Sequence, residues 1–193
     1  MFNAKDLCAV ELLDDIRNAG VMSFKIEGRT KSAYYTAMAT RSYRKAIDEM
    51  AEGKSFDPSN LDVLTTLSNR GYTTGFYTRN PREFGENIHD SRSKERSHKA
   101  VGLNCKWDQA TGLMWLDIKN KLGVGTEVEI FTPDGREIIR VSELRDNQGK
   151  QAERIHGGAG RGAFPLPEDP GEFAIIRRTL YEEEQVLVGA DPD

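Results

Sequence analysis

The chain has 193 residues, a formal net charge of −4 and a hydrophobic fraction of 37%. This length allows one large domain or two small ones. The slightly negative charge excludes a global attraction to nucleic acid, so any RNA contact must be local. No apolar run approaches the roughly 20 residues of a membrane-spanning helix, and the N-terminus has no signal-peptide core, so we expect a cytoplasmic protein without membrane contact.

Residues 1–79 follow a helix–strand–helix pattern that is typical of an α/β unit. Apolar residues at helical spacing from Leu7 to Ile16 predict a first helix, with Asn3 as its N-cap and Gly20 at its end. We expect a strand over residues 21–27. Because a lone strand cannot form a sheet, we expect this segment to be the C-terminal portion of a larger βα barrel, which needs about 250 residues.

The expected strand has two chemically different faces. Side chains alternate along a strand, so Met22, Phe24 and Ile26 would share one face, and Lys25 and Glu27 the other. Strands covered by helices on both faces are usually apolar throughout, so a charged pair at the carboxyl end indicates the wall of an active site. The alternative is a structural ion pair.

A long helix is expected next, from a cap at Thr30 to about Ala51. Its basic cluster consists of Arg41, Arg44 and Lys45. These cations could follow an RNA backbone, and a solvated helix face would explain them as well. A shorter helix over residues 61–68 and an extended loop over residues 70–76 complete this segment.

Residues 80–99 are polar and without periodicity, which predicts a linker. Short strands separated by glycine-rich turns then predict a small antiparallel β-barrel or sandwich over residues 100–181. The strands are expected at residues 101–105, 113–119, 127–132, 136–141 and 173–180, with a turn at residues 133–135. Residues 182–193 are expected to form a solvated acidic tail.

Four ordered blocks of the sequence resemble peptidase family U32, the collagenase-like peptidases. The blocks are residues 3–8 (NAKDLC), 23–29 (SFKIEGR), 43–48 (YRKAID) and 70–76 (RGYTTGF). The resemblance implies that residues 1–79 are the end of a TIM-like βα barrel and that residues 100–181 are similar to domain two of elongation factor Tu. The tRNA-hydroxylating branch is the most similar, which implies prephenate-dependent formation of 5-hydroxyuridine at the tRNA wobble position.

The resemblance also implies roles for particular residues. Lys25, Glu27 and Arg29 would line the reaction pocket of the whole protein. Hydroxylating relatives hold a [4Fe–4S] cluster on four cysteines, and Cys8 lies where the last ligand would fall. Without the resemblance, a small residue of the core is a simpler interpretation of Cys8 than a cluster ligand, and the same holds for Cys105. The other three ligands are absent from this sequence, so we expect this chain alone to lack the cluster and to be inactive.

Two other functions stay open. A collagenase-like peptidase would need a nucleophile or a metal site, but the sequence has no GxSxG or HExxH motif, and His98 lies in the expected linker without a nucleophile partner. A non-enzymatic module would use the β-barrel to bind RNA or a protein partner. Activity that survives without iron–sulfur assembly would favour the peptidase, and binding by residues 101–180 alone would favour the module.

Overall fold

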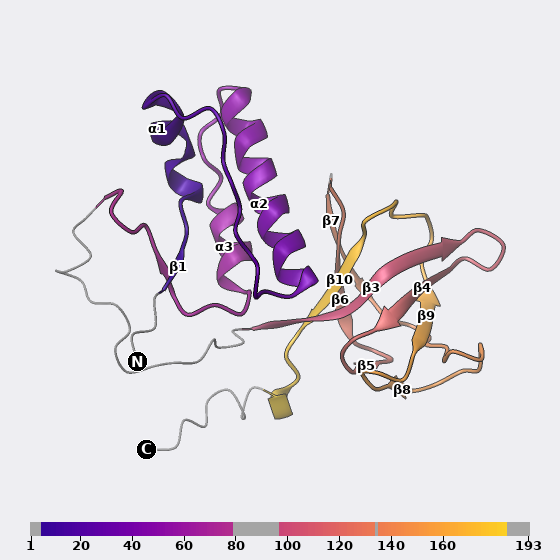
Figure 1. Ribbon diagram of the computed structural model, residues 1–193. Helices are drawn as coiled ribbons and strands as arrows, with labels where there is room; N and C mark the ends of the chain where they lie inside the picture. The colour runs from indigo at the N-terminus through magenta and orange to yellow at the C-terminus, as the bar shows by residue number, and fades with distance from the viewer. Residues whose placement is uncertain (1–4, 79–96, 134, 185–193) are drawn as a thin grey trace, which may run out of the picture. The chain divides into compact units, whose positions relative to one another are not determined.

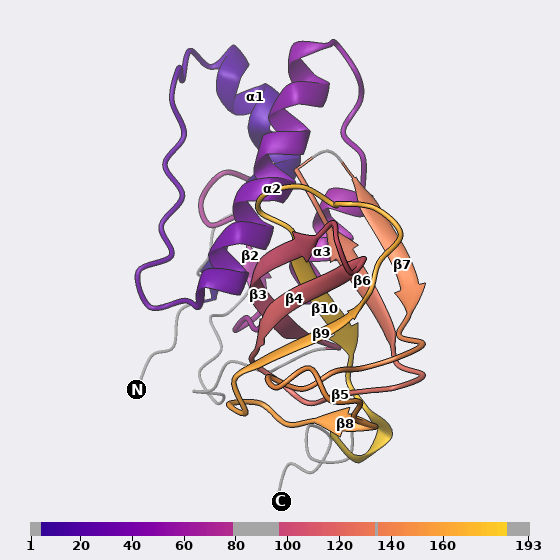
Figure 2. The same cartoon turned by 90° about the vertical axis from the view of Figure 1, so that its right-hand side faces the viewer.

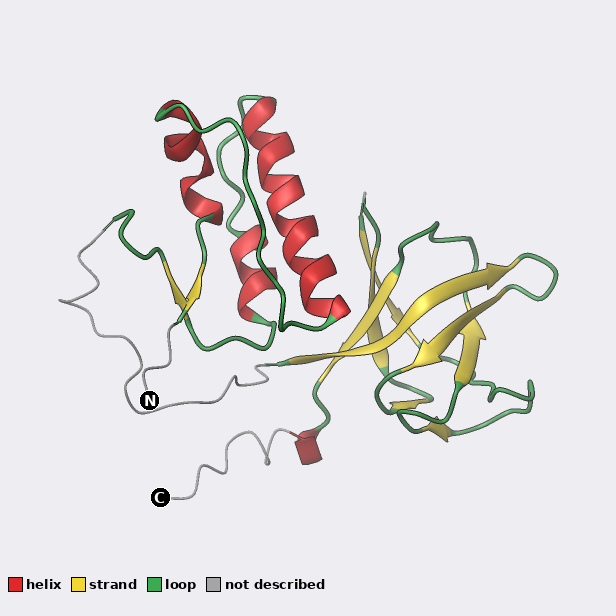
Figure 3. Cartoon of the chain, viewed as in Figure 1, coloured by secondary structure: helices red, strands yellow, loops and turns green. Residues whose placement is uncertain are grey.

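The computed structural model describes residues 5–78, 97–133 and 135–184, and the chain divides into two compact units (Figure 1). Residues 5–78 belong to the first unit and the remaining described residues to the second. Helices dominate the first unit and strands the second (Figure 3). Within these described ranges, no helix has the length and apolar character needed to cross a membrane.

The first unit packs three α-helices and a short 3-10 helix beside a short parallel strand pair. Its elements are β1 (Asp6–Leu7), η1 (Val10–Leu12), α1 (Leu13–Asn18), α2 (Ala33–Ala51), α3 (Ser59–Thr65) and β2 (Tyr72–Thr73). β1 and β2 pair in parallel, with Asp6 opposite Tyr72. The buried core comprises Val10, Leu13, Met38, Leu64 and Leu67, which η1, the three helices and the turn after α3 contribute. The strand pair therefore holds the two ends of the described segment together.

Our prediction of a strand at residues 21–27 is wrong. This segment forms neither a helix nor a strand and pairs with no described strand, and Met22 is 98% exposed. Alternating residues only form a strand when a neighbour supplies the hydrogen-bond ladder, and the described residues offer none here. The adjoining helices also differ from expectation. α2 is capped by Ser32, whose hydroxyl accepts the Tyr35 amide at 3.2 Å, rather than by Thr30.

The first expected helix is broken into pieces, and the second short helix is shifted. Residues 6–7 form β1, and the chain becomes helical only from η1 onwards. Leu7 is 60% exposed, so it does not belong to the apolar side of a helix. α3 covers Ser59–Thr65 instead of residues 61–68, and the expected N-cap Asn3 lies outside the described residues.

The second unit is a curled antiparallel sheet with a two-stranded companion (Figure 2). Its strands are β3 (His98–Asp108), β4 (Leu113–Ile118), β5 (Leu122–Gly123), β6 (Glu127–Phe131), β7 (Arg136–Arg140), β8 (Arg154–Ile155), β9 (Arg161–Pro165) and β10 (Ile175–Thr179). The six-stranded sheet has the order β7-β6-β10-β3-β4-β9, and β5 pairs with β8. The five strands that we expected correspond to β3, β4, β6, β7 and β10, while β5, β8 and β9 were not predicted.

The predicted linker and tail fall mainly outside the described residues. β3 begins at His98, so the last two residues of the expected linker are part of a strand. Residues 79–96 and 185–193 are not described, and neither is Asp134 in the expected turn at residues 133–135.

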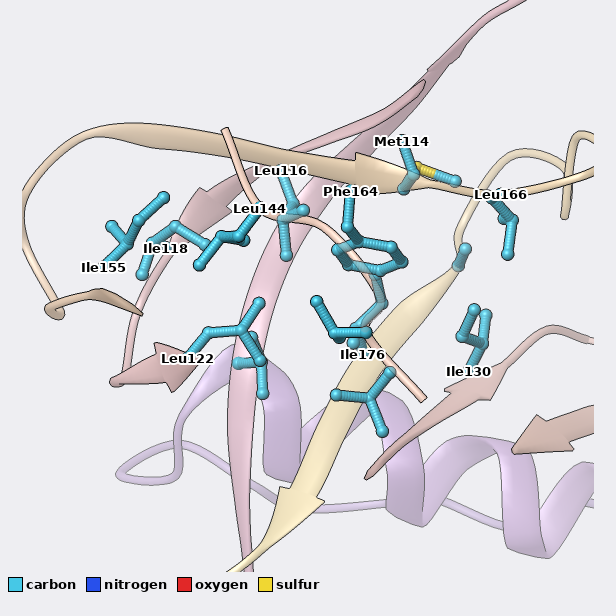
Figure 4. Close-up of a cluster of buried hydrophobic side chains, with 14 residues drawn as sticks. Met114, Leu116, Ile118, Leu122, Ile130, Leu144, Ile155, Phe164, Leu166 and Ile176 are labelled. Atoms are coloured by element: carbon cyan, nitrogen blue, oxygen red, sulfur yellow. The ribbon is translucent and has the colours of Figure 1, made fainter. Parts of the chain in front are cut away.

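In β4, alternate residues contribute to the core of the second unit. Met114, Leu116 and Ile118 of β4 are buried, whereas Trp115 and Asp117 lie on the other face of that strand. Side chains from β4, β6, β9 and β10 point into one shared interior (Figure 4). Burying this many aliphatic side chains, each worth about 1.5–3 kcal/mol, makes the core the main stabilising feature of the unit. The strand alternation thereby leaves a second face of β4 available for contacts outside the core.

Candidate functional site

A half-buried polar cluster surrounds Cys8 in the first unit. We call it the Cys8 cluster and define it as Asp6, Cys8, Lys31, Tyr35, Tyr43 and Tyr72. β1 supplies Asp6, and Cys8 follows it directly. Tyr35 and Tyr43 share one side of α2 because residues about two turns apart lie above one another. The parallel pairing of β1 with β2 brings Tyr72 beside Asp6.

An ion pair lies at one end of the cluster. Lys31 Nζ is 2.7 Å from Asp6 Oδ2, and both side chains are about one-fifth exposed, at 20% and 21%. The same ammonium donates to the Ser68 carbonyl at 3.4 Å and lies 4.6 Å from the Tyr35 ring centroid. Asp6 also accepts the Arg70 amide at 3.4 Å. Lys31 thus joins the start of α2 to β1 and to the segment between α3 and β2.

Two tyrosines continue the cluster. The hydroxyl groups of Tyr35 and Tyr72 are 3.4 Å apart, and Tyr72 donates to the Leu64 carbonyl at 3.0 Å. Burial raises the pKa of both phenols, so both are neutral at physiological pH. A neutral phenol has one proton to donate, and Tyr72 donates it to Leu64, so Tyr35 is the donor in the contact between the two hydroxyl groups.

Cys8 is 8% exposed and forms the other end of the cluster. Tyr43 donates to the Cys8 sulfur at 3.9 Å and accepts the Ala9 amide at 2.9 Å. Burial raises the pKa of the Cys8 thiol and that of the Tyr43 phenol. As the structure stands, Cys8 is a neutral thiol, whereas a metal ligand must be a thiolate.

These residues do not fit a four-cysteine cluster by themselves. A [4Fe–4S] cluster needs four thiolate ligands. Within the described ranges, no group of three or more His, Cys, Asp or Glu side chains is close enough to hold a metal ion. Cys105 belongs to the other unit, and burial raises the pKa of its thiol to about 12.

The residues that we predicted for the pocket lie between α1 and α2. Lys25 and Glu27 form an ion pair with an N–O distance of 3.6 Å, with side chains 87% and 67% exposed. Arg29 is also exposed. The structure brings the first two together at the surface of this segment. Their role in a reaction pocket, and that of Arg29, stays a prediction.

The predicted RNA-binding residues lie on α2. Arg44 donates to Asp48 one helical turn away, with 3.0 Å between Nε and Oδ2. Lys45 pairs with Asp57 at 2.7 Å and with Glu49 at 3.6 Å. Arg41 is half-buried. Acidic neighbours thus offset the charges of Arg44 and Lys45, and an RNA contact by this set stays a prediction.

Sequence reasoning named Cys8 but missed its neighbours. The signal that could have found most of them is their place in or near the four blocks quoted above. Asp6 and Cys8 share the first block, Tyr43 begins the third and Tyr72 lies in the fourth, while Lys31 follows the second by two residues. The blocks therefore mark positions that the fold gathers around Cys8.

A second set of titratable residues lies in the second unit. The Ser97 hydroxyl is 2.7 Å from His98 Nδ1, and His98 Nε2 is 3.5 Å from Glu129. His98 is thus in β3 with a serine beside it, contrary to our expectation. Burial would raise the pKa of Glu129, but His98 and Arg177 outweigh it and hold the pKa at about 2. Because Arg177 and Arg136 also bind this carboxylate, it is poorly suited to be the third member of a catalytic triad.

Comparisons with known proteins agree with the resemblance in the sequence. A family model described as peptidase family U32 matches residues 1–87, and one described as the U32 C-terminal domain matches residues 96–177. The tRNA hydroxylation protein P of Haemophilus influenzae is 35% identical over 179 residues, covering 92% of this chain and 39% of that protein. A collagenase of Porphyromonas gingivalis is 29% identical over 154 residues, covering 75% of this chain and 41% of that protein.

A solved structure is similar to part of this chain. It is the C-terminal domain of a Geobacillus thermoleovorans protein assigned to the U32 peptidases, with 20% sequence identity and a TM-score of 0.39. The match covers 42% of this chain and 99% of that one. The chain spans about two-fifths of the length of the curated relatives that it matches, at 39% and 41%.

Proposed function

Because the chain belongs to peptidase family U32, we propose that the protein takes part in tRNA hydroxylation. The observation that carries this proposal is the 35% identity to tRNA hydroxylation protein P over 92% of the chain. The reaction proposed is prephenate-dependent formation of 5-hydroxyuridine at the wobble position, in the cytoplasm. Since the chain spans only part of this relative, the activity is proposed for the whole protein, and this chain alone is expected to be inactive.

The fold that goes with this proposal is a TIM-like βα barrel ending at residue 79, followed by a barrel similar to domain two of elongation factor Tu. The parallel pairing of β1 with β2 supports the first part, because parallel strands are typical of α/β barrels. Exposed apolar side chains also support it, since Leu7, Met22 and Phe76 are 60%, 98% and 84% exposed. Further barrel elements in the whole protein would cover them.

The proposal assigns Lys25, Glu27 and Arg29 to the reaction pocket and Cys8 to the [4Fe–4S] cluster. The Cys8 cluster supports a site in this region, because it places an ion pair and two neutral phenols beside the only cysteine of the first unit. Three further ligands would have to come from outside this chain. tRNA is the proposed partner.

We expect the modification of tRNA to depend on the full-length gene. Deleting it should remove 5-hydroxyuridine and its derivatives from tRNA, and restoring it should return them. Nucleoside mass spectrometry of purified tRNA measures both changes. The same nucleoside profile with and without the gene would contradict the proposed function. The remaining candidates would then be a peptidase and a hydroxylase that acts on another substrate.

We expect Cys8→Ser in the full-length protein to lose cluster-bound iron and sulfide, because serine does not supply the thiolate that the cluster needs. Cys105→Ser is the matched control, since Cys105 lies in the other unit. Iron and acid-labile sulfide per chain, with the visible absorption spectrum, measure the difference. Equal iron and sulfide in both variants would remove Cys8 from the ligand set.

A collagenase-like peptidase is the second candidate. The Porphyromonas gingivalis collagenase, 29% identical over 75% of this chain, supports it. The Ser97–His98–Glu129 series supports it only weakly, because the carboxylate is bound by two arginines. Cleavage of denatured collagen by the full-length Cys8→Ser variant, freed of iron, would favour this candidate over tRNA hydroxylation.

A further inference from the structure

The outer face of the second unit carries a groove beside a tryptophan. The groove has a volume of about 730 Å³ and lies over β3, β4 and β9. Lys106 is opposite Trp115 in the pairing of β3 with β4, and Arg161 belongs to the neighbouring strand β9. Gln109 and Asn147 also line it, from the turn after β3 and from the segment before β8.

Trp115 is not part of the core. Its neighbours Met114 and Leu116 are fully buried on the inner face, and strand alternation turns Trp115 to the outer face, where it is half-buried. The Arg161 guanidinium lies 5.5 Å from the Trp115 ring centroid. Arg161 itself is exposed, so its side chain has room to move away from the ring. The groove therefore offers an aromatic face with an exposed cation above it.

The charge of the groove favours an anionic ligand. Lys106 and Arg161 are both exposed, and neither forms an ion pair with another described residue. Asp108, the acid that lines the groove, uses its carboxylate in its own turn, accepting the Ala110 amide at 3.1 Å and the Thr111 hydroxyl at 2.6 Å. The Thr111 and Ala110 hydrogen bonds, and also the charge of Lys106, lower the pKa of Asp108. With Lys106 and Arg161 against this one carboxylate, the lining keeps a net positive charge that favours an anionic ligand.

We propose that this groove binds an unpaired nucleotide of single-stranded RNA. The base stacks on Trp115, Arg161 moves off the ring to meet a phosphate, and Lys106 meets a neighbouring phosphate. Stacking on aromatic rings or guanidinium planes is how proteins bind unstacked RNA bases, and cations track the backbone. The amides of Gln109 and Asn147 can contact the edge of the base. The inference rests on the proposed function, because a tRNA substrate presents unpaired loop nucleotides.

The test is binding of a labelled hexauridylate to the full chain, measured by fluorescence anisotropy. We expect Trp115→Ala to weaken binding roughly tenfold, because a base–aromatic stack typically contributes an effect of about this size. Trp115→Phe keeps an aromatic face and should restore most of the affinity. We expect Arg161→Ala to reduce the slope of log K against log salt concentration by about 0.7, the value for one phosphate contact on a single strand.

Arg140→Ala is the matched charge control, because Arg140 is exposed on β7, at the opposite edge of the sheet from β9. It should leave both the affinity and the salt slope unchanged. A base-paired hairpin and an abasic hexamer should bind more weakly than hexauridylate. Equal binding by wild type and Trp115→Ala, or by the abasic strand and hexauridylate, would overturn the proposal. An acidic peptide that displaced the RNA at equal concentration would assign the groove to a protein ligand instead.

The RNA-binding test of the groove and the test of the proposed function can fail independently of each other. Hexauridylate binding requires no hydroxylation, so it can depend on Trp115 even if deletion of the gene leaves tRNA unchanged. That result would retain the groove and overturn the proposed function. Deletion of the gene could instead remove 5-hydroxyuridine while wild type and Trp115→Ala bind RNA equally well. That result would retain the proposed function and overturn the proposal that the groove binds RNA.

Discussion

Replacing Arg178 with methionine is expected to lower the free energy of unfolding of the second unit by about 3 kcal/mol, as when one partner of a buried ion pair is removed. Arg178 is completely buried. Its guanidinium binds both carboxylate oxygens of Glu184, at 2.7 and 3.0 Å, and donates to the carbonyls of Lys121 and Thr179. Methionine fills similar space but leaves these acceptors without their donor. Glu184 remains 18% exposed, which keeps the loss at the lower end of the range.

Urea unfolding followed by tryptophan fluorescence measures this effect in the intact chain. Both tryptophans, Trp107 and Trp115, lie in the second unit, so the signal reports that unit. Arg140→Met removes an exposed arginine from the same sheet and should change the free energy by less than about 0.5 kcal/mol. Similar losses in Arg178→Met and Arg140→Met would contradict the prediction.

The loss should also depend on pH. The hydrogen bonds from Arg178 hold the pKa of Glu184 at about 2, below its ordinary value of 4.5. A depressed pKa stabilises the fold fully above the ordinary value, and this contribution is lost as the pH falls through the folded value. The difference between wild type and Arg178→Met should therefore be largest near pH 7 and smaller at pH 3. If this difference in unfolding free energy grew as the pH fell, the ion pair with Glu184 would not be the source of the stability that Arg178 provides.

The strands of the second unit were largely predictable because each carries its own signal. In β4, the sequence LMWLDI alternates between the core and the outer face, and the structure confirms that alternation. β9 was missed because it follows a glycine-rich stretch, and Gly162 and Pro165 lie within its five residues. Its place in the sheet comes from pairing with β4, which no local pattern reveals.

The same reasoning failed at residues 21–27. The run from Met22 to Glu27 alternates as clearly as β4 does, yet it forms no ladder with a described strand. Alternation indicates which residues would share a face, but only a partner strand makes the segment a strand. The interpretation of Lys25 and Glu27 as an active-site wall depended on this strand, so it now stands on the family resemblance alone.

The Cys8 cluster shows why a site can be only partly predictable. Cys8 was singled out by the resemblance, whereas Lys31 and Tyr72 carry no individual signal. Tyr72 lies beside Asp6 because β1 and β2 pair in parallel although they are at opposite ends of the described segment, and Lys31 binds Asp6 from the start of α2. Long-range pairing of this kind is set by packing of the whole unit and cannot be read from a window of sequence.

The close approach of β3 to β4 leads to the second large effect, which is expected for Gly102→Ala. A Cβ atom at position 102 would lie 2.0 Å from Leu116 Cδ1, 2.8 Å from Cγ and 2.9 Å from Cβ. Leu116 is fully buried, so it cannot swing aside into solvent. Overpacking of this kind is expected to lower the free energy of unfolding by about 3 kcal/mol, at the upper end of the usual range. Gly123→Ala is the control, because its nearest contact would be an ordinary 3.5 Å and the residue is also buried in a strand.

A double-mutant cycle separates overpacking from a general loss of backbone freedom. Leu116→Ala alone should cost about 2–5 kcal/mol through the cavity that it leaves. If the new methyl group at position 102 clashes with Leu116, the loss of unfolding free energy in the double variant should be smaller than the sum of the two single losses. The difference should be at least about 1 kcal/mol. Urea unfolding followed by tryptophan fluorescence gives all four corners of the cycle. A clash with the Leu116 side chain predicts coupling between the two substitutions, whereas a backbone conformation that requires glycine predicts none. Strictly additive losses would therefore mean that position 102 needs glycine for its backbone.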